Sequence, residues 1–187
     1  MLIAFSGAQS SGKSTLLELC KDIKELKSYT FVEEVTRRIK RDKKVPINNT
    51  AKNYDETQRL IISDHITNSN LHNAVLDRCF MDGFVYTQYF YNQKKVSKSI
   101  LEYAREAYYN GFGNYDVIFY TDPTIPLVDD GVRSIDAGFR TDIVDLFEQE
   151  IDAMHMYAGV PIVTVAGTVK QRLKTINNWL ENNKNKL

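Results

Sequence analysis

The N-terminal stretch constrains the fold of this chain more than any other segment. The apolar run Leu2–Phe5 predicts a short buried strand. The pattern Gly7-x-x-x-x-Gly12-Lys13-Ser14 follows it directly, and apolar residues at helical spacing come next. Strand, glycine loop and helix in this order are typical of a loop whose backbone N–H groups surround phosphate oxygens. The sequence therefore predicts a phosphate-binding loop.

Each part of this loop has a predicted role. Gly7 and Gly12 leave room for main-chain amides near phosphate oxygens, and the helix N-terminus adds partial positive charge. We expect Lys13 to reach the β- and γ-phosphates of ATP as a catalytic residue, and the Ser14 hydroxyl to hold Mg²⁺. The predicted ATP-binding residues are Gly7, Gln9, Ser10, Ser11, Gly12, Lys13, Ser14 and Thr15.

Length and composition favour one domain spanning residues 1–187. Lys plus Arg and Asp plus Glu number 24 each, a balance that argues against broad nonspecific affinity for nucleic acid. No apolar run approaches the roughly 18 residues that span a membrane, and the N-terminus lacks a basic signal-peptide region. Cys20 and Cys79 have no disulfide or metal spacing. We therefore expect a cytoplasmic protein with reduced thiols and no membrane partner.

Apolar strands and amphipathic helices alternate about five times along the chain. After the first strand, we expect strands at 29–32, 73–78, 115–120 and 160–165. The spacing predicts helices over 14–26, 55–72, 80–91, 97–109, 139–157 and 169–180. The fold class expected is α/β: a three-layer α/β/α P-loop NTPase fold with a five-stranded parallel sheet and a helical or lid insertion.

Charged residues follow the second and third predicted strands, where ligands bind in sheets of this kind. Asp77 could bind magnesium directly or through water, or accept a proton; alternatively, Asp77 and Arg78 form a surface ion pair. Arg78 offers bidentate contacts to phosphate, and Arg37 could grip a phosphate from beside Glu34. The basic run Arg37–Lys44 is either a solvated helix face or a contact surface for nucleic acid.

Further candidates are predicted for the acceptor substrate. Gln58, on a long helix, either reads a base or amide or is an exposed helical residue. Phe80 and Phe84 belong to an aromatic helix, and they either stack on a substrate ring or pack in the core. The segment 124–140 is polar and carries Arg133 and Arg140, so we expect either an ordinary surface loop or a lid whose arginines neutralise transferred charge.

The chain resembles the small P-loop kinases of the nucleoside and nucleotide kinase group. Its Asp77-Arg78 pair is similar to the Asp-Arg pair of thymidylate kinases and the Glu-Arg pair of deoxynucleoside kinases, although Cys79 follows it here. The segment Asp129-Asp130-Gly131-x-Arg133, with Arg140, resembles the lid of ribosylnicotinamide kinase-type, AAA-like domains. Glu34-x-x-Arg37 has a counterpart in the same domains. No apolar strand ends in Asp-Glu, which disfavours a mechanical ATPase.

The resemblance implies ATP and Mg²⁺ as cofactors, with Ser14 and Asp77 at the metal. It leaves Glu34 and Asp77 as alternatives for the base, and it gives Arg133 and Arg140 the role of clamping phosphates. The implied function is an ATP-dependent kinase that transfers the γ-phosphoryl group to a nucleoside, nucleotide or ribosylnicotinamide-like acceptor.

Two other functions are compatible with the sequence. One is a kinase acting on a hydroxyl of a nucleic acid, or of a modified base in it, which the run Arg37–Lys44 and the aromatic helix would favour. The other is a P-loop ATPase switch without an acceptor. The sequence sets neither the acceptor nor the oligomeric state, for which a dimer is one option.

Overall fold

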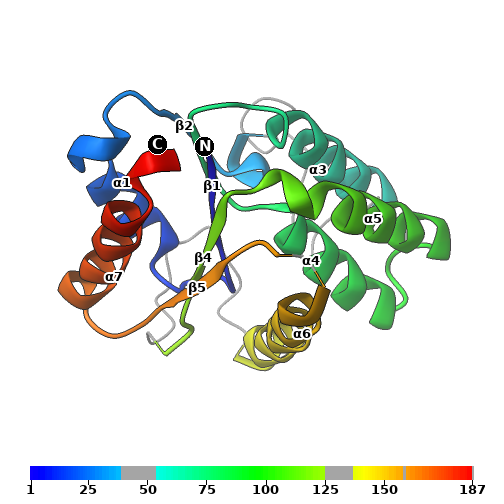
Figure 1. Ribbon diagram of the computed structural model, residues 1–187. Helices are drawn as coiled ribbons and strands as arrows, with labels where there is room; N and C mark the ends of the chain where they lie inside the picture. The colour runs from blue at the N-terminus through cyan, green and yellow to red at the C-terminus, as the bar shows by residue number, and fades with distance from the viewer. Residues whose placement is uncertain (39–53, 125–136, 158, 187) are drawn as a thin grey trace.

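The computed structural model describes residues 1–38, 54–124, 137–157 and 159–186. Within these ranges, the strands form one parallel sheet in the order β2-β3-β1-β4-β5 (Figure 1). The strands are β1 (Leu2–Ser6), β2 (Thr30–Val32), β3 (Ala74–Asp77), β4 (Val117–Thr121) and β5 (Ile162–Val165). In register, Phe5 of β1 lies beside Asp77 of β3, and Ser6 lies beside Tyr120 of β4. The carboxyl ends of the three central strands are therefore level.

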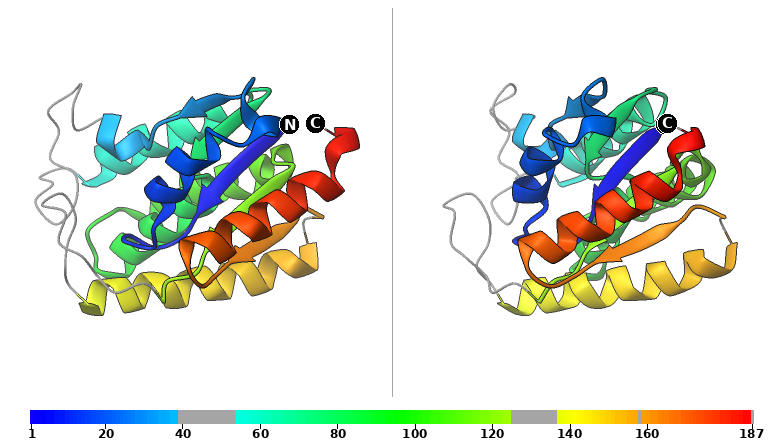
Figure 2. Two further views of the ribbon diagram at one scale, coloured as in Figure 1. Left: turned by 90° about the vertical axis from the view of Figure 1, so that its left-hand side faces the viewer. Right: turned by 60° about the vertical axis from the view of Figure 1, so that its left-hand side comes forward.

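Helices cover both faces of the sheet. The helices are α1 (Lys13–Cys20), α3 (Tyr54–Asn68), α4 (Phe80–Asn92), α5 (Lys98–Gly111), α6 (Ala137–Tyr157) and α7 (Val169–Asn182), with short 3-10 turns η1 (Lys24–Leu26), η2 (Phe112–Asn114) and η3 (Lys184–Lys186). Helices α1 and α7 lie together on one side of the sheet, and α3, α4, α5 and α6 lie on the other (Figures 1 and 2). This is the three-layer α/β arrangement that the sequence predicts.

Alternating side chains of the strands feed two apolar cores. In β4, Ile118 and Tyr120 join the core beneath α4, α5 and α6, whereas Val117 and Phe119 join the core beneath α1 and α7. The Trp179 ring of α7 meets Phe119 edge-on, with centroids 5.8 Å apart, as expected for a residue that packs the last helix onto the sheet. Both faces of the central strands are therefore buried, which explains their continuous apolar runs.

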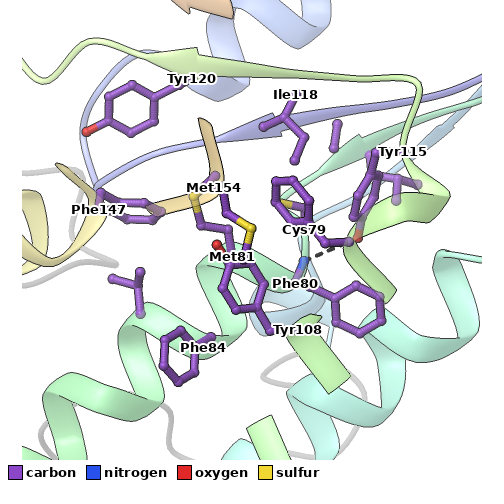
Figure 3. Packing of buried hydrophobic residues seen from close by; sticks show 14 of the residues in the cluster. Cys79, Phe80, Met81, Phe84, Tyr108, Tyr115, Ile118, Tyr120, Phe147 and Met154 are labelled. Carbon is purple, nitrogen blue, oxygen red and sulfur yellow. Dashed lines mark hydrogen bonds between the residues drawn. The ribbon is translucent and has the colours of Figure 1, made fainter. Parts of the chain in front are cut away.

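The larger core is rich in aromatic and sulfur-containing side chains from α4, α5 and α6 (Figure 3). Phe84 of α4 stacks on Tyr108 of α5, with centroids 5.2 Å apart and ring planes 11° apart. Met81 and Met154 fill the space between these rings and the sheet (Figure 3). This packing fixes α4, whose N-terminus carries part of the candidate site.

Most predicted elements are confirmed to within a few residues, but the first helix is shorter than predicted. It ends at Cys20 instead of continuing to Leu26. Lys21 is the C-cap, and the backbone is extended at Ile23. The short turn η1 then buries Leu26 in the same core as the apolar face of α1. Of the expected lid, 125–136 lies outside the described residues. No helix in the described ranges has the length and apolar character needed to cross a membrane.

Candidate functional site

The glycine loop lies at the carboxyl end of β1 and is held tightly against β4. A Cβ on Gly7 would lie 2.6 Å from Thr121 Oγ1 and 2.9 Å from the Thr121 carbonyl, and its φ of +132° also excludes most side chains. The hydroxyls of Ser11 and Thr121 are 2.6 Å apart, and Thr121 Oγ1 donates to the Ser6 carbonyl. Gly12, with φ +83°, is the N-cap of α1. The loop geometry therefore requires the predicted glycines.

The ammonium group of Lys13 lies within this loop. Its Nζ donates to the carbonyls of Gly7 and Ala8, at 2.6 and 2.7 Å, and to Ser11 Oγ at 3.1 Å, and the side chain is only 2% exposed. Lys13 thus bonds to the loop itself. A phosphate oxygen placed in the loop would offer this ammonium a charged acceptor, which forms stronger hydrogen bonds than a carbonyl.

The other loop residues differ in exposure. Gln9 is buried, and its Oε1 accepts a hydrogen bond from the Tyr86 hydroxyl of α4 at 2.9 Å, while its Nε2 has no partner among the described residues. Ser10 has a left-handed backbone with φ +56°. Ser14 is half-buried and Thr15 exposed in the first turn of α1. These residues lie together, and their predicted contacts with ATP stay predictions.

Glu34, two residues beyond the end of β2, is a buried carboxylate that accepts several hydrogen bonds. Its Oε1 accepts from Arg78 Nε at 2.6 Å and from Thr36 Oγ1 at 2.8 Å, and its Oε2 accepts from Arg37 Nε at 3.1 Å. The structure therefore brings together Glu34, Arg37 and Arg78, three residues predicted for the site. Both arginines donate to the Glu34 carboxylate through charge-assisted hydrogen bonds.

Arg78 is also bound from the other side. Its Nη1 donates to Asp82 Oδ1 at 2.8 Å, and its guanidinium carbon lies 5.0 Å from the centroid of the Tyr86 ring. Burial opposes the charge on Arg78, but Glu34, Tyr86 and Asp82 together raise its pKa well above the ordinary value. The partners of Arg78 are thus Glu34 and Asp82, and not the adjacent Asp77 with which the sequence pairs it.

Asp82 is a member of this cluster that sequence reasoning missed. Its Oδ2 accepts from the main-chain N–H of Cys79 at 3.1 Å, completing a capping box at the start of α4. The sequence contained one part of the capping-box pattern, an acidic residue three positions after the N-cap. The other part was missing, because the N-cap is a cysteine instead of the usual serine or threonine.

Asp77, the last residue of β3, lies between Glu34 and the glycine loop. Its Oδ1 is buried and has no hydrogen-bond partner in the described part of the chain. Burial and then the charge of Glu34 raise the pKa of Asp77, while Arg78 and Lys13 oppose the rise. An unpartnered carboxylate oxygen beside a phosphate loop fits a role at Mg²⁺, which prefers oxygen ligands.

The predicted magnesium site contains few protein ligands. In the described ranges, no group of three or more His, Cys, Asp and Glu side chains is placed to hold a metal. Asp77 and the Ser14 hydroxyl would therefore share Mg²⁺ with phosphate oxygens and water, which is how Mg²⁺ is usually bound beside nucleotides. The residues present fit that mode of binding.

The residues predicted for the acceptor fall into two groups. Gln58 of α3 is 3% exposed, so the exposed-helix alternative is wrong, and its Oε1 lies 3.0 Å from the hydroxyl of Thr87 in α4. Phe80 packs against Gly111 and Tyr115, and Phe84 stacks on Tyr108. These contacts correspond to the core-packing alternative for Phe80 and Phe84, and we do not assign these rings to the acceptor.

The remaining predicted cations are only partly described. Arg133 lies outside the described residues, as does 39–44 of the basic run. Arg140, near the start of α6, donates from Nη2 to the carbonyl of Pro123, just beyond β4. Arg38 forms an ion pair with Asp64 of α3. The two described residues of the basic run, Arg37 and Arg38, thus each face a carboxylate.

Sequence comparisons place the chain in a known family. Residues 2–172 match the family model described as "AAA domain". A search among curated protein sequences found no match. The matched segment includes the glycine loop, the buried charge cluster and the start of α7.

Solved structures with a similar fold include proteins that handle nucleotides. The NadR protein in complex with NR superposes with a TM-score of 0.69 at 17% identity over 96% of this chain. The match covers 50% of NadR, so this chain spans about half of that protein's length. Deoxyadenosine kinase from M. mycoides gives 0.65 at 18% identity, covering 97% of this chain and 99% of the kinase.

Thymidylate kinase from Candida albicans gives a TM-score of 0.64 at 18% identity, covering 98% of this chain and 92% of the kinase. At these sequence identities, the similarity shows that the fold is shared. The expected resemblance to small P-loop nucleotide kinases is therefore confirmed for the fold.

Proposed function

We propose that this chain transfers the γ-phosphoryl group of ATP to a small acceptor. The chain belongs to the AAA domain family, and it has the fold of the small P-loop nucleotide kinases. The acceptor would be a nucleoside, a nucleotide or a ribosylnicotinamide-like molecule. One observation carries the proposal: ion pairs join the buried residues Glu34, Arg78 and Asp82, and the main-chain N–H of Arg78 donates to the carbonyl of Phe5, near the end of the strand that leads into the glycine loop.

The sheet order separates the donor and acceptor sides of the site. The loop follows β1, Asp77 ends the neighbouring β3, and Glu34 follows β2 at the sheet edge. Asp77 therefore lies between the loop and Glu34. This order suits transfer from a triphosphate on the loop, past Asp77, to an acceptor near Glu34.

On the donor side, the loop would hold the phosphates of ATP. Backbone N–H groups at the start of α1 would bind phosphate oxygens, and Lys13 would move from the loop carbonyls to the β- and γ-phosphates. When bound through Ser14 and Asp77, Mg²⁺ would supply charge neutralisation at the phosphate chain.

On the acceptor side, Glu34 would orient the acceptor group and Arg78 would stabilise negative charge. Phosphoryl transfer passes through a loose transition state, so positioning and charge stabilisation matter more than a strong base. Hydrogen bonds from Thr36, Arg37 and Arg78 already orient the Glu34 carboxylate. Asp77, with its unpartnered oxygen, suits the metal side better. Gln58 would contact the acceptor from α3.

Transfer of label from γ-labelled ATP tests the proposal. With Mg²⁺, we expect phosphorylation of at least one member of a panel of nucleosides, nucleoside monophosphates and ribosylnicotinamide. Lys13→Met should abolish it, whereas Lys21→Met, which removes an exposed lysine just after α1, should leave it unchanged. ATP binding without transfer to any member of the panel would exclude the proposed activity.

A further inference from the structure

A buried arginine of the last helix contacts the glycine loop from behind. Arg172 lies in the first turn of α7 and is the largest side chain in the described ranges with less than 2% exposure. No carboxylate in the described ranges forms an ion pair with it. Its guanidinium instead donates to three main-chain carbonyls: Ser11 at 2.7 Å, Gly167 at 2.9 Å and Asp122 at 3.1 Å.

These three carbonyls come from three different turns. Ser11 is in the glycine loop after β1, Asp122 follows β4, and Gly167 lies between β5 and α7. Because β1, β4 and β5 are neighbours in the sheet, one guanidinium joins the carboxyl ends of three adjacent strands. Figure 1 shows α7 beside α1 on the same face of the sheet.

The contact with Ser11 fixes the direction of a peptide group. In a trans peptide the carbonyl and the following N–H point to opposite sides. Holding the Ser11 carbonyl toward Arg172 therefore turns the N–H of Gly12 away from the guanidinium. Gly12 has the left-handed φ of +83°, so this peptide has an orientation that few other residues would adopt.

Packing alone is a poor explanation for a charged side chain at this position. Burying a guanidinium carries a large desolvation penalty, and apolar side chains of similar volume often replace buried charges without loss of stability. The fork of donors, by contrast, can bind several carbonyls in a fixed plane, which neither lysine nor an apolar residue can do.

We propose that Arg172 is a positioning residue for the triphosphate, setting the Ser11–Gly12 peptide so that its N–H binds a phosphate oxygen. Arg172 does not touch the nucleotide; it acts through the main chain of the loop. This inference rests on the proposed function, because it requires that the loop bind a nucleoside triphosphate. It does not depend on which acceptor is used.

Titration of the full chain with Mg·ATP, without acceptor, tests this role. We expect Arg172→Met to raise the Kd for ATP about 10-fold to 100-fold, because the loop would no longer hold its hydrogen-bond donors in place for a charged phosphate. Arg172→Lys, which can satisfy only part of the carbonyl set, should give an intermediate Kd. Lys170→Met removes an exposed charge two residues away and should leave the Kd unchanged.

Two further readouts separate positioning from stability. The ³¹P resonance of the bound β-phosphate should shift in Arg172→Lys relative to the parent, and kcat should fall while the KM for the acceptor stays constant. If Arg172→Met does not fold, Arg172→Lys decides. A variant that unfolds at lower temperature yet binds ATP with the parental Kd and the parental ³¹P shift would overturn the inference. Failure of the parent protein to bind ATP would instead overturn the proposed function.

Discussion

Glu34 shows at the scale of a single residue how the site holds its charges. The carboxylate is buried, and Arg78, Arg37 and Thr36 all donate to it. The two arginines that donate to Glu34 differ in exposure to solvent: the side chain of Arg78 is 8% exposed and that of Arg37 is 38% exposed. The negative charge of Glu34 therefore matters mainly to Arg78, which has little access to solvent.

Removing that charge should cost far more stability than removing its exposed partner. Glu34→Gln keeps the shape and acceptor oxygen but leaves Arg78 with less compensation, so we expect a loss of about 3 kcal/mol in the free energy of unfolding. Arg37→Gln, the matched control, should lose no more than about 1 kcal/mol. Urea unfolding at neutral pH measures both. Equal losses would show that Glu34 is not the main counter-charge of Arg78.

At the scale of elements, the N-terminus of α4 is positioned by the end of α5. Gly111, the last residue of α5, lies so close to Phe80 that a Cβ there would approach Phe80 Cε2 to 2.1 Å. Phe80 follows Arg78 by two residues and donates its N–H to the Tyr115 hydroxyl at 3.2 Å. Packing at this helix end therefore bears on the orientation of the charge cluster.

Gly111→Ala should destabilise the protein by about 1–3 kcal/mol, because the added methyl overpacks against a buried ring. Gly113→Ala is the matched control, since nothing lies within 4 Å of a Cβ at that position. Thermal unfolding compares the two variants. The packing described here would be wrong if Gly111→Ala were as stable as the control.

The contact of α3 with α4 includes His65, whose imidazole is buried beside Phe80 and Gly83. Neither ring nitrogen has a hydrogen-bond partner in the described ranges. Burial, opposed by the charge of Asp82, lowers the pKa of His65 from 6.5 to about 4. Between these values the unfolded chain binds a proton that the folded protein does not, so stability falls as the pH drops through this window.

His65→Leu should therefore reduce the acid sensitivity of the fold. We expect the parent to lose on the order of 3 kcal/mol more than the variant between pH 7 and pH 4. His72→Leu, at an exposed position after α3, should behave like the parent. Urea unfolding at several pH values checks this. Parallel curves for the parent and His65→Leu would show that His65 is not buried in the neutral form.

The elements also show which features the sequence could predict. The loop from Gly7 to Ser14 is contiguous, so its spacing alone predicts strand, turn and helix. Arg172 and Asp82 are different, because the partners of Arg172 lie in turns that follow three separate strands and Asp82 caps a helix whose N-cap is a cysteine. After the early end of α1, the chain turns and buries Leu26 in a core that includes residues of distant strands. Local periodicity contains none of this information.

At the scale of the whole molecule, the parallel sheet brings separate segments to one edge. The register of β1, β3 and β4 levels their carboxyl ends, so Asp77 and Thr121 both lie next to the loop. The sequence predicts this convergence through the general rule for parallel sheets. It does not predict the order β2-β3-β1-β4-β5, which puts Asp77 between the loop and Glu34.

The ratio of ADP formed to acceptor phosphorylated tests most directly whether donor and acceptor meet in one site. It is measured in a single reaction, with ADP quantified by chromatography and the phosphorylated acceptor by mass spectrometry. Once the panel has given an acceptor, we predict about one ADP per phosphorylated molecule, with ADP formation rising as acceptor is added. ADP formation that no acceptor changes, without any phosphorylated product, would contradict the proposed transfer and favour an ATPase without an acceptor.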